Sequence, residues 1–389
     1  MGICLSKKST RRTRFNSNRI AHQSSTTSIN RWSRFRSSSV NSDNFDDAVI
    51  RGQAIAAALL YQQHQQNGDV LNFDRSVSVR RHSGRPKSLQ SVSRSPSTQR
   101  RNSLIDPTQF SFSYQELNHD ELETSHIVLV HGGGFGAWCW YKTIALLQEC
   151  KFKVTAIDLS GCGIDLVDPN SIKSLSHYVK PLTDFLEHLT DGEKVILAGH
   201  DFGGACISYA MELYPTKVAK AIFIAASMVK TGQSTLDMFF NKENTNDLMR
   251  HAQKFLYANG HNQPPTAIDL DKSLLKDLLF NQSSPKDVAL ALVSMRPIPF
   301  SPVLEKLSLS KSNYGSIRRF YIETAEDNAI PIALQQIMID ESPPVKVFRL
   351  KGADHCPFFS KPQALHKLLV EIAKINKTEQ LLPDSKDDF

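Results

Sequence analysis

The sequence predicts a mainly parallel α/β sheet flanked by helices, and two observations carry this prediction. Short apolar runs rich in β-branched residues recur between residues 121 and 380, and helical patterns separate most of them. Strands and helices that alternate in this way are typical of a parallel sheet with helices on its faces. The apolar runs are residues 126–130, 153–159, 195–198, 221–225, 317–322 and 345–350, and the helical patterns include residues 140–148, 175–189 and 205–213.

The first 105 residues differ in composition from the rest of the chain. They carry 18 Lys and Arg against 5 Asp and Glu, whereas the remaining residues carry 28 against 34. A Ser/Arg-rich segment of this kind lacks the folded basic surface with stacking aromatic residues that nucleic-acid binding requires. We therefore expect a basic, mostly disordered leader at 1–120 with one helix near 46–66, followed by a folded domain at 121–389.

The sequence also argues against a membrane-spanning protein and against a protein held together by zinc or disulfides. The longest apolar stretches, residues 54–61 and 221–226, are far shorter than the ~20 residues that cross a bilayer. The six cysteines contain no C-x-x-C pair, so neither a zinc site nor a disulfide framework is indicated.

The start of the leader leaves three interpretations open. The sequence MGICLS fits the pattern for myristoylation of Gly2, and Cys4 could carry a second acyl chain, which would hold the protein at a membrane surface on the cytoplasmic face. Basic residues at 7–14 would strengthen that attachment. However, abundant Ser and Arg with no acidic residue before Asp43 is also the composition of a chloroplast transit peptide. An unmodified tail is the third alternative.

A strand, a tight glycine turn and a helix follow one another at residues 195–213. The strand runs into Gly199-His200-Asp201-Phe202-Gly203-Gly204, and a helical pattern begins directly afterwards. Glycines on both sides of a turn let two backbones approach closely, which is the geometry of a nucleophile elbow. We expect the side chain of Asp201 to stand exposed above the edge of the sheet.

An acidic residue and a histidine follow two later strands. Asp327 comes after the strand at 317–322, and His355 comes after the strand at 345–350. The carboxyl ends of parallel strands form the edge where α/β sheets bind ligands, so Asp201, Asp327 and His355 are expected to meet there. Their order along the chain is that of the nucleophile, acid and histidine in hydrolases with an elbow.

Together these stretches resemble the plant methylesterase and hydroxynitrile lyase family of α/β hydrolases. The resemblance runs from about residue 125 to residue 373, and the long leader resembles that of the extended members, which are described as chloroplast methylesterases. The matching stretches are HG at 131–132, GAWCWYK at 136–142, DL at 158–159, GH-x-FGG at 199–204, ED at 326–327 and GADH at 352–355.

The resemblance implies a catalytic triad at Asp201, Asp327 and His355, and an oxyanion hole formed by the backbone N–H groups of Gly133 and Phe202. Position 201 departs from the family, whose members carry serine in the elbow. The resemblance also implies small methyl esters of carboxylic acids, such as indole-acetate, jasmonate or salicylate, as substrates, with no metal and no organic cofactor.

Lyase activity is disfavoured because the lyases carry a lysine directly after the catalytic histidine, where this chain has Cys356.

Asp201 changes the chemistry that the site can perform. A serine gives its proton to histidine and attacks the acyl carbon, whereas a carboxylate would form an anhydride and expel a far more basic alkoxide. We therefore expect weak or altered ester hydrolysis, with Asp201 or His355 as general base on a water molecule. The alternatives are a catalytically inactive protein that binds a small ester or acid, and a hydrolase whose carboxylate forms an alkyl-enzyme ester. Two carboxylates beside His355 should also favour its charged form.

The segment at about 227–312 lacks long apolar strands and contains several helical patterns, so we expect a helical cap over the site. An apolar pocket beneath the cap is the expected binding site for a small ester. The sequence does not specify an oligomeric state. Candidate lining residues are Phe135, Tyr257, Leu279, Phe280, Met295 and Cys356.

Overall fold

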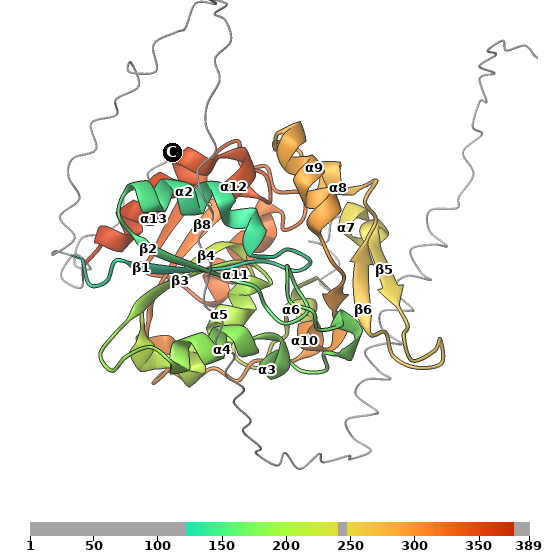
Figure 1. Cartoon of the computed structure of the whole chain (residues 1–389), viewed down its shortest axis with the longest axis horizontal. Helices are drawn as coiled ribbons and strands as arrows, with labels where there is room; N and C mark the ends of the chain where they lie inside the picture. The colour runs from blue at the N-terminus through green and yellow to red at the C-terminus, as the bar shows by residue number, and fades with distance from the viewer. Residues whose placement is uncertain (1–121, 240–246, 377–389) are drawn as a thin grey trace, which may run out of the picture. The chain divides into compact units, whose positions relative to one another are not determined.

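The structure, a computed structural model, describes residues 122–239 and 247–376, and its centre is a six-stranded sheet (Figure 1). Every pair of neighbouring strands in this sheet is parallel. The order of the strands is β2-β1-β3-β4-β8-β9. Their bounds are β1 His126–Val130, β2 Lys153–Ile157, β3 Val195–Asp201, β4 Val218–Ala226, β8 Arg318–Thr324 and β9 Lys346–Leu350.

All six strands coincide with apolar runs in the sequence, and the predicted parallel α/β fold class is confirmed. β1 lies between two partners, so that Ile127 pairs with Val154 on one side and with Ile196 on the other. Every residue of β1 and β4 is buried, because helices cover both faces of a parallel sheet. β4 begins three residues earlier than predicted.

Two helical layers enclose the sheet, and each has its own apolar core (Figure 1). On one face, α2 (Tyr141–Glu149), α12 (Pro357–Ser360) and α13 (Pro362–Lys374) bury side chains such as Leu147, Phe358 and Leu368. On the other face, the helices are α3 (Leu175–Tyr178), α4 (Lys180–Glu187), α5 (Gly203–Leu213) and α11 (Ile332–Glu341).

The helix expected at 175–189 is divided in two. Val179 separates α3 from α4, and Pro181 occupies the first turn of α4. Proline has no N–H to donate to the preceding turn and fits only at the start of a helix, so a new helix begins here.

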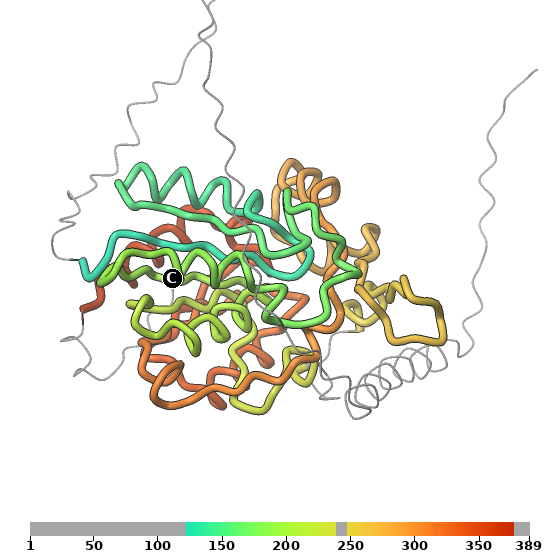
Figure 2. The backbone as a smooth tube through the Cα atoms, turned by 60° about the horizontal axis from the view of Figure 1, so that its bottom comes forward, coloured from blue at the N-terminus to red at the C-terminus, as the bar shows by residue number. Residues whose placement is uncertain are grey.

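The segment between β4 and β8 contains short helices and a second, antiparallel sheet of three strands, β5 (Gln253–Leu256), β6 (Ala267–Leu270) and β7 (Ile298–Pro299). Figures 1 and 2 both show α7 to α9 with β5 and β6 at one end of the main sheet. The sequence predicted a helical cap here and did not indicate these three short strands. The strands have two to four residues each, too few for a period to be recognised in the sequence. The helices are α6 (Thr235–Phe239), α7 (Asp247–Ala252), α8 (Leu275–Leu278), α9 (Pro285–Ser294) and α10 (Phe300–Leu304).

The predictions for the leader lie outside the described residues, and they include the helix near 46–66 and acylation at Gly2 and Cys4. Among the helices of the described part, none is both long enough and apolar enough to cross a membrane.

Candidate active site

Asp201 stands in a strained turn at the carboxyl end of β3. Its φ angle is +50°, in the left-handed region that costs a residue other than glycine about 1 kcal/mol or more. Glycines allow the close packing around it: a Cβ on Gly199 would lie 2.7 Å from the carbonyl oxygen of Gly203, and a Cβ on Gly203 would lie 2.6 Å from that of His131. The chain then enters α5 directly, so the side chain at 201 projects from the carboxyl edge of the sheet.

A bulge in β4 lies beside this turn. His200 pairs with Ile224 and Asp201 pairs with Ala226, so the register of the two strands skips Ala225. This residue has a φ of +43°. The hydroxyl of buried Tyr321 accepts from the N–H of Ala226 at 3.1 Å and donates to its carbonyl at 3.0 Å. Sequence reasoning missed Tyr321, although a tyrosine in a buried strand signals that its hydroxyl has a partner.

His355 and Asp327 form a buried pair. The Nδ1 atom of His355 donates to Oδ2 of Asp327 at 2.9 Å. Three other donors hold the same carboxylate: the hydroxyl of Thr324 at 3.0 Å and the N–H groups of Ala329 and Ile330, each at 2.8 Å. With Nδ1 committed to Asp327, the Nε2 atom of His355 faces the elbow.

The turn that carries His355 is fixed by Asp354. Its carboxylate is buried and accepts four hydrogen bonds: Oδ1 from the N–H of Cys356 and the hydroxyl of Ser360, and Oδ2 from the N–H of Gln282 and the hydroxyl of Ser283. The residue before His355 therefore ties this turn to the segment between α8 and α9. Burial raises the pKa of Asp354, and the four donors oppose that effect.

His355 lies between two carboxylates. Its Nε2 atom is 3.9 Å from Oδ1 of Asp201, on the side opposite Asp327. Burial disfavours a charge on the ring, but Asp327 and then Asp201 outweigh it and raise the pKa of His355 to about 9. His355 is therefore mostly an imidazolium near pH 7, in the direction expected from the sequence.

The backbone donors of the expected oxyanion hole bind the chain's own side chain. The N–H of Gly133 donates to Oδ2 of Asp201 at 2.8 Å, and the N–H of Phe202 also donates to this carboxylate. Burial raises the pKa of Asp201, whereas His355 and these two N–H groups counteract the shift. A substrate carbonyl could reach these donors only after the carboxylate moved aside.

A small apolar cavity of about 70 Å³ opens beside Asp201 and His355. Phe135 and Leu279, two of the candidate lining residues named from the sequence, lie in its wall. Sequence reasoning missed other lining residues because they come from α6, α7 and the small antiparallel sheet: Thr235, Leu236, Met249, Gln253, Ile268, Leu270 and Ile298.

Four other candidates lie outside the lining of this cavity. Phe280 packs edge-on against Phe135, with ring centroids 6.2 Å apart, and Tyr257 packs against His261. Met295 lies over Gly134, and Cys356 is buried beneath the His355 turn. The burial of Cys356 raises its pKa well above the usual thiol value.

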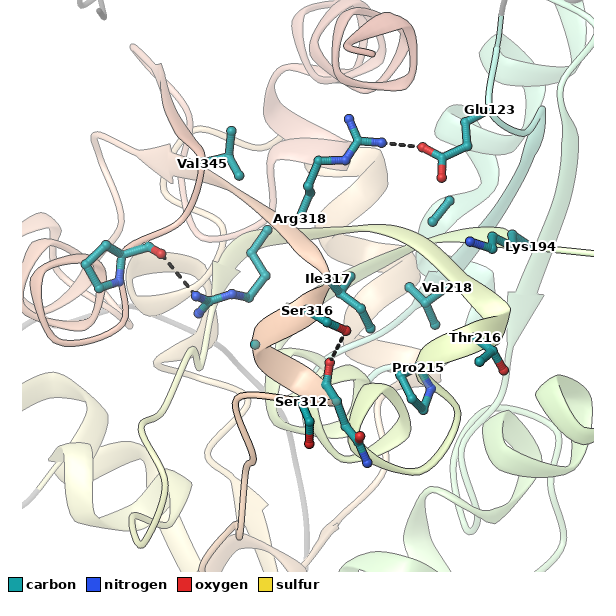
Figure 3. Close-up of a pocket in the computed structure, with 15 residues that line it drawn as sticks. Glu123, Lys194, Pro215, Thr216, Val218, Ser312, Ser316, Ile317, Arg318 and Val345 are labelled. Atoms are coloured by element: carbon teal, nitrogen blue, oxygen red, sulfur yellow. Dashed lines mark hydrogen bonds and ion pairs between the residues drawn. The ribbon is translucent and has the colours of Figure 1, made fainter. Parts of the chain in front are cut away.

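A larger cavity of about 760 Å³ lies at the amino ends of β3, β4 and β8, away from the elbow (Figure 3). Two of its charged groups are already engaged: Arg318 binds Glu123, and Arg319 donates to the carbonyl of Pro343 at 3.1 Å. No histidine lines it. The smaller cavity is therefore the candidate active site. Within residues 122–239 and 247–376, no cluster of His, Cys, Asp and Glu side chains could hold a metal ion.

Comparison with known proteins gives the same fold and a family. Residues 127–368 match the alpha/beta hydrolase family. The Arabidopsis thaliana protein named "Putative methylesterase 11, chloroplastic" is 64% identical over 353 residues, which cover 89% of this chain and 90% of that protein. The chain belongs to the plant methylesterase family of α/β hydrolases.

Solved structures of related proteins have the same architecture. The methylesterase MES16 from Arabidopsis is 33% identical, with a TM-score of 0.58 over 64% of this chain and 98% of that one. Tomato methylketone synthase I, solved with 2-tridecanone bound, has the same identity, coverage and TM-score.

Proposed function

We propose that this methylesterase-family protein hydrolyses a small methyl ester of an apolar carboxylic acid, slowly and by direct attack of water. The observation that carries the proposal is the pair Asp201 and His355 in the lining of an apolar cavity, with Asp327 hydrogen-bonded to His355. Methyl esters of indole-acetate, jasmonate or salicylate are the candidate substrates, in keeping with the methylesterase names of the relatives.

In this reaction the neutral form of His355 is the general base. A water molecule forms a bond to the acyl carbon while Nε2 takes its proton, and the proton then passes to the departing methanol oxygen. Asp327 stabilises the imidazolium that forms. The Asp201 carboxylate must leave the N–H of Gly133 before that donor can stabilise the oxyanion, and this requirement slows the reaction.

Assays of the full chain on a methyl-ester panel test the proposal, with His355→Ala as the matched variant. Hydrolysis that exceeds the buffer rate and disappears in His355→Ala is the expected result. If the two proteins are equally inactive, the esterase proposal is wrong.

The second candidate is a catalytically inactive protein that binds a small ester or acid. Two features favour it: the donors at Gly133 and Phe202 are occupied, and His355 is charged near pH 7. Saturable binding of a panel ester without turnover would support this alternative.

An alkyl-enzyme route is the third candidate, because Oδ1 of Asp201 faces Nε2 of His355 at 3.9 Å and is not the oxygen that the N–H of Gly133 holds. Displacement at saturated carbon also needs an acid for the leaving group, and no tyrosine lines the described cavity. A single turnover in ¹⁸O-water separates the routes, because only the alkyl-enzyme route places label in the Asp201 carboxylate.

We also propose that the leader directs the protein to the chloroplast. The support is the word chloroplastic in the names of relatives that share 64%, 54% and 58% identity and that match this chain beyond the hydrolase domain. Acylation at Gly2 and Cys4 is the competing prediction for the same residues.

A further inference from the structure

We infer that the pocket binds an apolar molecule through a hydroxyl group, whose oxygen bridges His355 and Asp201. This inference goes beyond the ester chemistry proposed above and holds whether or not the chain turns over an ester. It rests on three features of the site: the occupied backbone donors, the gap between the two side chains, and an unpartnered hydroxyl in the cavity wall.

The occupied donors decide which ligand groups fit. An ester carbonyl only accepts hydrogen bonds, and the N–H groups of Gly133 and Phe202 already donate to Asp201. The groups that remain are an acceptor, Oδ1 of Asp201, and a donor, Nε2 of charged His355. A ligand carboxylate would bring a third negative charge beside Asp201 and Asp327, which is unfavourable.

The distance between these two groups matches one bridging oxygen. At 3.9 Å, Nε2 of His355 and Oδ1 of Asp201 are too far apart for a direct hydrogen bond. An oxygen at ~2.8 Å from both atoms closes this gap. A hydroxyl can accept from Nε2 and donate to Oδ1 at the same time, whereas an ester lacks the proton and an ammonium lacks the lone pair.

The cavity wall adds the apolar part of the recognition. Leu236, Ile268 and Ile298 surround the space next to the two side chains. An alcohol that displaces water from the bridge keeps both hydrogen bonds and buries its apolar remainder, which favours it over water.

Thr235 supplies a second polar contact. Its hydroxyl is buried, lines the same cavity and has no hydrogen-bond partner among the described residues. Buried hydroxyl groups are normally paired. A second polar group on the ligand would satisfy Thr235, so the ligand class is an apolar alcohol or phenol with a further oxygen or nitrogen atom.

Fluorine NMR on the full chain at pH 7 tests the inference with three probes of similar shape: 4-fluorobenzyl alcohol, 4-fluorotoluene and methyl 4-fluorobenzoate. The alcohol is expected to bind at least tenfold more tightly than the other two. In Asp201→Asn the alcohol should lose its tighter binding. The affinity of this variant for 4-fluorotoluene should stay the same, and this unchanged affinity shows that its pocket is still folded. Asp191→Asn removes an exposed carboxylate elsewhere and should change nothing.

The variant Thr235→Val shows whether the probes bind in this pocket. The variant replaces the unpartnered hydroxyl with a methyl group of the same shape and should tighten 4-fluorotoluene several-fold. If no probe responds to Thr235→Val, binding lies outside this pocket and the inference is wrong.

Three other outcomes overturn the inference: tighter binding of the ester than of the alcohol, an alcohol advantage that persists in Asp201→Asn, and failure of all three probes to bind. Because the measurement is equilibrium binding, absence of ester turnover affects only the proposed hydrolysis.

Discussion

The Oδ2 atom of Asp201 lies 2.8 Å from the backbone nitrogen of Gly133, so the carboxylate occupies a donor that the family resemblance assigns to a substrate oxyanion. In the serine members that the sequence resembles, the elbow side chain attacks the substrate and this donor receives the oxyanion. In this chain one carboxylate both replaces the nucleophile and engages the donor.

Asp201→Ser should therefore increase ester hydrolysis. The exchange frees the N–H of Gly133 and supplies a hydroxyl that His355 can deprotonate. We expect kcat on the best methyl ester to rise by about 10²–10³-fold, the usual effect of one oxyanion donor. Steady-state kinetics of methanol release measure the change. Asp201→Ala frees the donor without adding a nucleophile and should lie between the two proteins; a serine variant no faster than the natural chain would contradict this account.

The hydrolysis rate of the natural chain should rise with pH. His355 has its pKa raised to about 9, so the neutral base is scarce at pH 7 and increases about tenfold per pH unit until that value is approached. The profile of kcat/KM between pH 6 and pH 10 measures this. Asp201→Asn removes one of the two flanking carboxylates and should move the inflection to lower pH. A flat profile between pH 6 and pH 9 is inconsistent with His355 as the base.

Asp354→Asn should destabilise the protein and disturb His355. Each oxygen of the Asp354 carboxylate accepts two hydrogen bonds, so in either orientation of the asparagine amide its NH₂ group replaces an oxygen that two donors need. Each buried group left without a partner lowers the stability of the fold by about 1–3 kcal/mol. Denaturant unfolding should show a loss of about 2 kcal/mol or more. Asp340→Asn, at an exposed position of α11, is the matched control. Equal stability of the two variants would mean that Asp354 does not hold the His355 turn.

Tyr321→Phe should loosen the elbow without touching the reacting groups. The change leaves the buried N–H and carbonyl of Ala226 without the hydroxyl, at a cost of about 1–3 kcal/mol. Tyr178→Phe is the control, because its equally buried hydroxyl has, among the described residues, a single hydrogen-bond partner, the thiol of Cys162 at 3.4 Å. In the Asp201→Ser background, kcat should fall for Tyr321→Phe and stay the same for Tyr178→Phe. If Tyr321→Phe and Tyr178→Phe changed kcat equally, the hydrogen bonds of Tyr321 to the β4 bulge would have no specific role in holding the elbow.

The strands of the main sheet could be predicted because a strand buried on both faces is a continuous apolar run, as at 126–130. The edge that collects Asp201, Asp327 and His355 then followed from strand direction alone. Apart from Phe135 and Leu279, the pocket wall was not predicted, since residues such as Ile268 and Ile298 lie on strands of four and two residues that are specified by tertiary packing.

The occupied donor at Gly133 was also beyond sequence reasoning. The sequence indicates that a carboxylate replaces a hydroxyl at 201, but which way the carboxylate turns depends on three surrounding groups. The side chain of Asp, which is longer than that of Ser, reaches an N–H group that the family resemblance assigns to the substrate oxyanion.

Gly2→Ala distinguishes the two predictions for the leader. Myristoylation requires the glycine, whereas import of a transit peptide does not, so we expect the variant to reach the chloroplast as the natural chain does. Fractionation of plant cells that express the full chain with a C-terminal fluorescent protein measures the location. Deletion of residues 2–105 is the control and should abolish import. Release of the protein from membranes by Gly2→Ala, with no material in the chloroplast for either form, would instead support the acylated anchor.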